Sequence, residues 1–267
     1  MSEPSYADLL SAVALRSDRA TAEVPPGWSQ GRATFGGLVV ALALRALRER
    51  VPEGRRLRGL QTAFVGPVRP GEVAIRVREL RHGGSASQLQ AELSQAGEVG
   101  CVVLASFGAD RPSRLAVAPP PRPEAPPPES LPALAAPPGI VPEFTRHFDY
   151  RFVTRTLPYT GTGDGTLTGW CRFRRSPEAA SPEHVVALVD CWPAPIVAVL
   201  TEPAPVSSLV WGLELVDPDP AAPADGWWLF HGATDAAHHG YAHWHAALWD
   251  PAGRLAALSR QTAAVFW

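Results

Sequence analysis

The segment over residues 36–50 constrains the fold most strongly, because it has the composition of a helix and is apolar on nearly every side from Leu38 to Arg45. A helix without a polar face is buried rather than laid on a surface. Gly36 and Gly37 at its start would allow another backbone or a ligand to approach its positive end, although tight packing explains them equally well. The rest of the chain must therefore wrap around this helix.

Four strand-like runs follow the helix, and glycine- or proline-containing turns separate them. Apolar and polar residues alternate in several of them, as in Val73, Ile75 and Val77 against Arg76 and Arg78, so one face of each strand is buried. A short amphipathic helix over 5–16 and a strand over 19–24 precede this group. The four strands are predicted over residues 57–66, 73–81, 87–94 and 100–107.

Residues 111–142 contain 12 Pro in 32 residues, which predicts an extended linker with polyproline character. We therefore place domain boundaries here, with one unit over 1–110 and a second over 143–267. The second unit repeats the order of the first, and Leu93 and Gly97 have echoes in Leu248 and Gly253. Its predicted elements are strands over 145–153 and 166–174, an apolar helix within 185–200, and strands over 206–216, 226–235, 242–249 and 254–266.

One carboxylate, Asp190, interrupts the apolar segment 185–200. Burying an ionised carboxylate costs several kcal/mol unless hydrogen bonds or a partner offset it. We place Asp190 near the start of the second helix, where backbone N–H groups would hold it, and a purely structural helix cap is the rival interpretation. Pro193 and Pro195 then require a helix that begins near residues 192–194 or is distorted.

Several short motifs follow one another along the chain, including Phe35-Gly-Gly-Leu-Val-Val, Leu80-Arg-His-Gly-Gly-Ser85, Val189-Asp190, Ser207-Ser-Leu209 and Ser259-Arg-Gln261. Their order resembles that of the double hot-dog thioesterases, in particular the acyl-CoA thioesterase II family. The resemblance implies an α+β tandem (double) hot-dog fold, in which two long antiparallel sheets, each wrapped around a central helix, join into one continuous sheet. It also implies that acyl-CoA thioesters are hydrolysed to a free acid and CoA by an activated water.

By the same resemblance, the family's catalytic Asp, hydroxyl residue and Gln fall on Asp190, Ser208 and Gln261. A carboxylate can accept the proton of the water, while a hydroxyl and a primary amide can fix its direction. Ser207 lies next to Ser208 on the opposite face of the strand, so a register slip of one residue would exchange them. We expect Phe35, Gly36, Gly37 and Ser207 on the substrate side of the site.

Two other functions stay open on the sequence alone. A non-catalytic acyl-CoA- or lipid-binding protein would keep the fold without the water. A hot-dog enoyl-CoA hydratase or dehydratase would need an Asp–His pair, and His184 lies six residues before Asp190. The chain also departs from the family at Gln88-Leu89-Gln90, where relatives have arginines, so any binding of CoA phosphates must use Arg elsewhere.

Charge and composition exclude several kinds of partner. The net charge is −2, which gives no reason to expect nucleic acid or membrane binding. Residues 1–122 nevertheless carry 16 Arg and 11 acidic residues, against 8 and 15 in residues 123–267. This asymmetry fits either ordinary surface variation or an anion-facing patch on the first half.

The remaining expectations concern location, cofactors and assembly. Three cysteines at positions 101, 171 and 191, with no signal-peptide pattern at the N-terminus, predict a cytoplasmic protein without structural disulfides. We expect no cofactor and no metal, although five histidines lie close together in the sequence, and we expect a homodimer or a higher homo-oligomer. The histidines are His231, His238, His239, His243 and His245.

Overall fold

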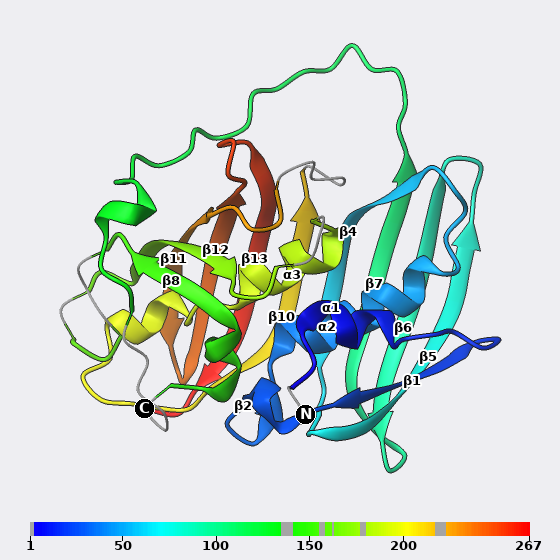
Figure 1. Ribbon diagram of the computed structural model, residues 1–267, viewed down its shortest axis with the longest axis horizontal. Helices are drawn as coiled ribbons and strands as arrows, with labels where there is room; N and C mark the ends of the chain where they lie inside the picture. Colours follow the sequence, from blue (N-terminus) through cyan, green and yellow to red (C-terminus); the bar gives the residue numbers. More distant parts are fainter. Residues whose placement is uncertain (1–2, 135–140, 155–157, 162, 177–179, 217–222) are drawn as a thin grey trace.

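The computed structural model describes residues 3–134, 141–154, 158–161, 163–176, 180–216 and 223–267. Its main element is an antiparallel sheet of 11 strands in the order β1-β5-β6-β7-β4-β10-β13-β12-β11-β9-β8 (Figure 1). The first half comprises α1 (Tyr6–Ser11), β1 (Arg19–Val24), η1 (Pro26–Trp28), β2 (Ser29–Gln30), β3 (Ala33–Thr34), α2 (Gly36–Arg48), β4 (Arg55–Phe64), β5 (Gly71–His82), β6 (Ala86–Gln95) and β7 (Glu98–Ala109).

The second half repeats this plan after the proline-rich segment. Its elements are η2 (Pro128–Ser130), η3 (Glu143–His147), β8 (Phe148–Phe152), β9 (Thr166–Phe173), α3 (Pro182–Asp190), η4 (Pro195–Ala198), β10 (Val206–Leu215), β11 (Trp228–His238), β12 (Tyr241–Trp249) and β13 (Leu255–Val265). Strand β4 pairs with β10, with Gln61 opposite Gly212, so the two halves form one continuous sheet. The predicted tandem hot-dog architecture is therefore confirmed.

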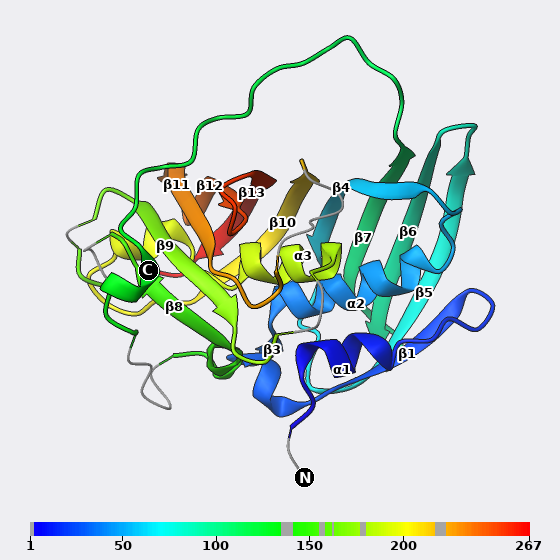
Figure 2. The same cartoon turned by 45° about the horizontal axis from the view of Figure 1, so that its top comes forward.

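Helices α2 and α3 lie side by side against one face of this sheet (Figure 2). They run antiparallel, because the start of α2 meets the end of α3 at Asp190 while Arg48 at the end of α2 pairs with Glu183 at the start of α3. A Cβ added to Gly37 would lie 3.1 Å from the Cα of Ala187, so glycine permits this close packing. No helix in the described part of the chain is long and apolar enough to span a membrane.

Two local features show that the halves are related by a pseudo-twofold operation. Both helices contain the same tetrapeptide, Val-Val-Ala-Leu, at 39–42 and at 185–188. Both central strands also carry a β-bulge at the same place, since Leu57 lies opposite Phe107 just as Ser208 lies opposite Ala263. Counting from these two shared features identifies the equivalent residues of the two halves.

The proline-rich segment leaves β7, arches away from the sheet and returns to its second half (Figure 1). Its later part is not a free linker, because it packs on the sheet face opposite the helices. The indole Nε1 of Trp170 donates to the Pro126 carbonyl at 2.9 Å, and Ala125 and Leu131 pack against a cluster that contains Trp170 and Trp249. The domain boundaries at 110 and 143 stay a prediction.

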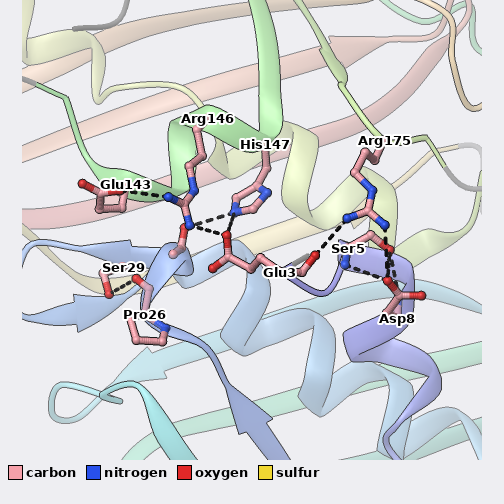
Figure 3. Close-up of polar contacts among 10 residues, drawn as sticks. Glu3, Ser5, Asp8, Pro26, Ser29, Glu143, Arg146, His147 and Arg175 are labelled. Carbon is pink, nitrogen blue, oxygen red and sulfur yellow. Dashed lines mark hydrogen bonds and ion pairs between the residues drawn. The ribbon is translucent and has the colours of Figure 1, made fainter. Parts of the chain in front are cut away.

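A polar cluster ties the N-terminal residues to the second half (Figure 3). Arg146 pairs with the Glu3 carboxylate, and Arg175 donates to the Glu3 carbonyl at 2.9 Å and pairs with Asp8. The imidazole of His147 belongs to the same cluster, 3.9 Å from the Glu3 carboxylate, and stacks on Trp28 with ring centroids 3.8 Å apart. The cluster therefore adds cross-half contacts to those made by the sheet and the helix pair.

Candidate active site

Asp190 is the last residue of α3, so its sequence-based placement near the start of the second helix is wrong. The helix begins at Pro182, and the backbone N–H of Ser181 donates to Nδ1 of His184 at 3.1 Å. A Ser followed by Pro is itself a helix-start signal, which the sequence reasoning overlooked. The helix has already ended before Pro193, and Pro195 is the first residue of η4, so neither proline distorts α3.

The Asp190 carboxylate nevertheless faces the start of a helix, namely α2 of the other half. It accepts a hydrogen bond from the backbone N–H of Gly37. A Cβ added to Gly36 would lie only 2.8 Å from Asp190 Oδ2. The positive end of the α2 dipole and the absence of side chains at Gly36 and Gly37 therefore allow the carboxylate to sit against the backbone.

Two later strands complete a chain of hydrogen bonds from Asp190. The Nε2 of Gln261 on β13 donates to Asp190 Oδ1 at 3.0 Å. The hydroxyl of Ser208 on β10 donates to Oε1 of Gln261, also at 3.0 Å. The structure thus brings the three residues together, whereas Ser207 is exposed.

Burial of Asp190 raises its pKa from 3.8 to about 7, and the hydrogen bonds from Gln261 and Gly37 oppose this shift only in part. Both donors are uncharged, so they solvate the carboxylate without supplying a full positive charge. A carboxylate with a pKa near neutral pH is a stronger base than an exposed one and is still ionised in a useful fraction of molecules. The electrostatics therefore suit general base chemistry.

The aromatic residues beside the glycines divide between core and site. Phe35 is fully buried, and its ring stacks on Phe144 with centroids 4.2 Å apart, so its side chain serves the core. The ring of Phe64 lies 3.2 Å from the Cβ position of Gly36 and is only partly buried. Sequence reasoning did not single out Phe64 for the site, because it is the last residue of a strand whose pairing with β10 was not known.

The hydrogen-bonded set occurs in one half only. We compared it with the equivalent positions of the first half, counting from the shared tetrapeptide and the shared bulge. All three counterparts are buried and apolar: Leu44 for Asp190, Leu57 for Ser208 and Ala105 for Gln261. The pseudo-twofold operation therefore repeats the fold but not the polar chemistry.

A cavity of about 810 Å³ lies on the sheet face opposite the helices, and Pro120 and Pro121 contribute to its lining. Arg260 lines it, while its neighbour Gln261 points to the helices, since successive residues of a strand face opposite sides. His245 in this cavity bonds to Asp235 at 2.7 Å. Among the residues that the structure describes, no group of His, Cys, Asp or Glu is arranged to hold a metal ion.

Comparisons with known proteins agree with this architecture. Residues 24–108 match a family model described as the acyl-CoA thioesterase N-terminal domain, and residues 123–265 match one described as the C-terminal domain. No curated protein matches the sequence.

Solved structures show the same fold at low sequence identity. A hot-dog protein of unknown function from Alicyclobacillus acidocaldarius superposes with a TM-score of 0.88 at 20% identity, covering 98% of each chain. Acyl-CoA thioesterase II TesB2 from Mycobacterium marinum gives 0.76 at 21%, also covering 98% of each chain. The tesB protein of Mycobacterium avium subs paratuberculosis gives 0.80 at 19%, over 98% of this chain and 99% of that one. With both halves matched by its family models, the chain belongs to the acyl-CoA thioesterase family of hot-dog proteins.

Proposed function

We propose that this protein hydrolyses acyl-CoA thioesters, with Asp190 as the general base. The observation that carries the proposal is a chain of hydrogen bonds, in which Ser208 donates to Gln261 and Gln261 donates to the Asp190 carboxylate. This carboxylate is partly buried and has a pKa of about 7. Each member can serve a water molecule: the carboxylate accepts its proton, and the hydroxyl and amide set its direction.

In the proposed reaction, the water oxygen forms a bond with the thioester carbonyl carbon while Asp190 takes a water proton. The tetrahedral intermediate then collapses and the carbon–sulfur bond breaks. The proton held by Asp190 passes to the sulfur, so CoA leaves as a thiol and the acyl group leaves as a carboxylic acid. Orientation and general base catalysis of this kind contribute on the order of several kcal/mol to the barrier reduction.

A hydratase or dehydratase would need a histidine beside Asp190 to form an Asp–His pair. His184 belongs to the same helix as Asp190 but lies at the other end, where its Nδ1 accepts from the Ser181 backbone. A non-catalytic binding protein would differ from a thioesterase in releasing no thiol from the bound acyl-CoA.

We also propose that the protein works in the cytoplasm as a homodimer or higher oligomer. Light scattering after size exclusion would test the oligomeric state.

The decisive experiment measures free thiol released from a panel of acyl-CoAs of increasing chain length. We expect release by the wild-type protein and loss of at least about a hundredfold in Asp190→Asn, because the general base is removed. Asp235→Asn is the matched control, since this acid lies on the opposite sheet face with His245 and Arg260. Equal rates for wild type and Asp190→Asn would disprove the role of Asp190, and saturable binding without release would favour a binding protein.

A further inference from the structure

A second cavity, of about 230 Å³, lies at the end of the helix pair opposite Asp190. Pro182 at the start of α3 and Arg48 at the end of α2 line it, together with the beginning of β4. Helix α2 has 13 residues, so its ends lie about 18 Å apart at 1.5 Å per residue. The second cavity is therefore well separated from the carboxylate.

This cavity occupies the pseudo-twofold counterpart of the Asp190 site. Its apolar wall contains Leu57 and Phe107, the two residues that face each other at the β4–β7 bulge. Their equivalents in the second half are Ser208 and Ala263. The two ends of the helix pair therefore differ in chemistry: one holds the hydrogen-bonded Asp190 set, and the other holds this recess.

Arginines dominate the second recess. Arg48, Arg55 and Arg56 all line it. The Arg48 guanidinium is neutralised by Glu183 at 2.8 Å, and Arg56 lies 3.5 Å from Asp110.

The charge of Arg55 is not offset in this way. Its Nη1 donates to Ser87 Oγ at 2.5 Å, and its Nη2 donates to the carbonyls of Gly83 and Gly84 at 2.6 and 3.1 Å. All of these acceptors are uncharged. Among the described residues, no carboxylate pairs with Arg55, so its guanidinium brings a positive charge to the recess.

We propose that this recess binds a phosphate or diphosphate group. Guanidinium groups match the geometry of phosphoryl oxygens through paired N–H donors, and the start of α3 adds the positive end of a helix dipole. The buried side chains of Leu57 and Phe107 keep water from one side of the recess and strengthen these interactions. A volume of about 230 Å³ corresponds to roughly seven water molecules, so the recess holds a phosphoryl head rather than a whole nucleotide.

The proposal explains one feature of the sequence that the catalytic chemistry leaves unused. The excess of Arg over acidic residues in residues 1–122 includes this cluster. The phosphoryl group belongs either to a free phosphorylated compound or to CoA itself, and the chemistry of recognition is the same.

Calorimetric titration with inorganic pyrophosphate tests the site directly. We expect saturable binding to the wild-type protein and at least about tenfold weaker binding to Arg55→Gln, since one charge-assisted contact is lost. Arg76→Gln is the matched control, because Arg76 pairs with Asp18 on a strand remote from the recess and should bind as wild type does. Absence of saturable binding to the wild-type protein, or equal binding by wild type and Arg55→Gln, would overturn the proposal.

Arg55 also holds the β5–β6 turn, so a folding defect must be separated from a binding defect. Arg56→Gln supplies the second variant, because Arg56 is exposed and pairs with exposed Asp110. It should weaken pyrophosphate binding while the thermal unfolding midpoint stays close to that of wild type, and unchanged binding would again contradict the site. Parallel titrations identify the source: weaker binding of ADP with unchanged binding of CoA in Arg56→Gln indicates a free nucleotide, whereas weaker binding of CoA as well indicates the phosphates of CoA.

Discussion

Asp190 should destabilise the folded protein at neutral and alkaline pH, and the size of this effect follows from its pKa. Burial raises the pKa from 3.8 to about 7, so the folded state holds a proton that the unfolded state releases between these two values. Stability must then fall as pH rises through this window. A difference of about 3 pKa units corresponds to about 4 kcal/mol, since each unit is worth about 1.4 kcal/mol.

Asp190→Asn removes this titration while keeping the shape of the side chain. The Gln261 amide can rotate to accept from the new Nδ2 group, and its own NH2 can then donate to the Ser208 hydroxyl. We therefore expect the variant to gain stability relative to wild type by up to about 4 kcal/mol between pH 4 and pH 8. The same variant should lose thioester hydrolysis, so stability and activity would change in opposite directions.

Chemical denaturation of both proteins across this pH range measures the effect. The difference between their free energies of unfolding isolates Asp190, because all other titrating groups are common to both. A difference that does not change with pH, or that favours wild type as pH rises, would refute the account of a desolvated carboxylate. In wild type, kcat/KM for thiol release should rise with pH through a midpoint near 7, where the base becomes ionised.

Four further substitutions test the surrounding structure. Ser208→Ala should lower kcat by about tenfold to a hundredfold, and Ser207→Ala should leave it unchanged in the same thiol-release assay, because only Ser208 bonds to Gln261. Gly37→Ala should destabilise the protein by about 1–3 kcal/mol in denaturant titrations, since its Cβ would press on the backbone of α3. Trp170→Phe should loosen the proline-rich segment and accelerate limited proteolysis there, because it removes the bond to the Pro126 carbonyl.

The order of elements could be predicted from the sequence because each signal is local. Strand alternation and turn residues depend on near neighbours, and the all-round apolar character of 38–44 already requires a covering sheet. The duplication then indicated how two such units would join. The β4–β10 pairing confirms this arrangement.

The site was harder to predict because its parts come from four separate segments, namely α2, α3, β10 and β13. The sequence indicated a carboxylate that needs backbone N–H donors, but the donor belongs to Gly37 of the other half and not to the helix of Asp190 itself. Local reasoning therefore assigned the correct kind of interaction to the wrong helix. The arginine recess could not be predicted for the same reason, since Arg48 and Arg55 approach Pro182 through the antiparallel packing of the helices.

The two ends of the helix pair show how one framework can hold one carboxylate against a cation and another against neutral donors. At one end, Glu183 is buried against the Arg48 guanidinium and the Ser181 hydroxyl, which together offset its charge. At the other end, the donors to Asp190 within the described part of the chain are an amide and a backbone N–H, and burial raises its pKa. Because a full positive charge would hold the carboxylate ionised and weaken it as a base, its replacement by neutral donors is what makes Asp190 suited to proton transfer. The two ends of the helix pair are equivalent in the fold, and the Arg48 guanidinium beside Glu183 is what distinguishes one carboxylate from the other.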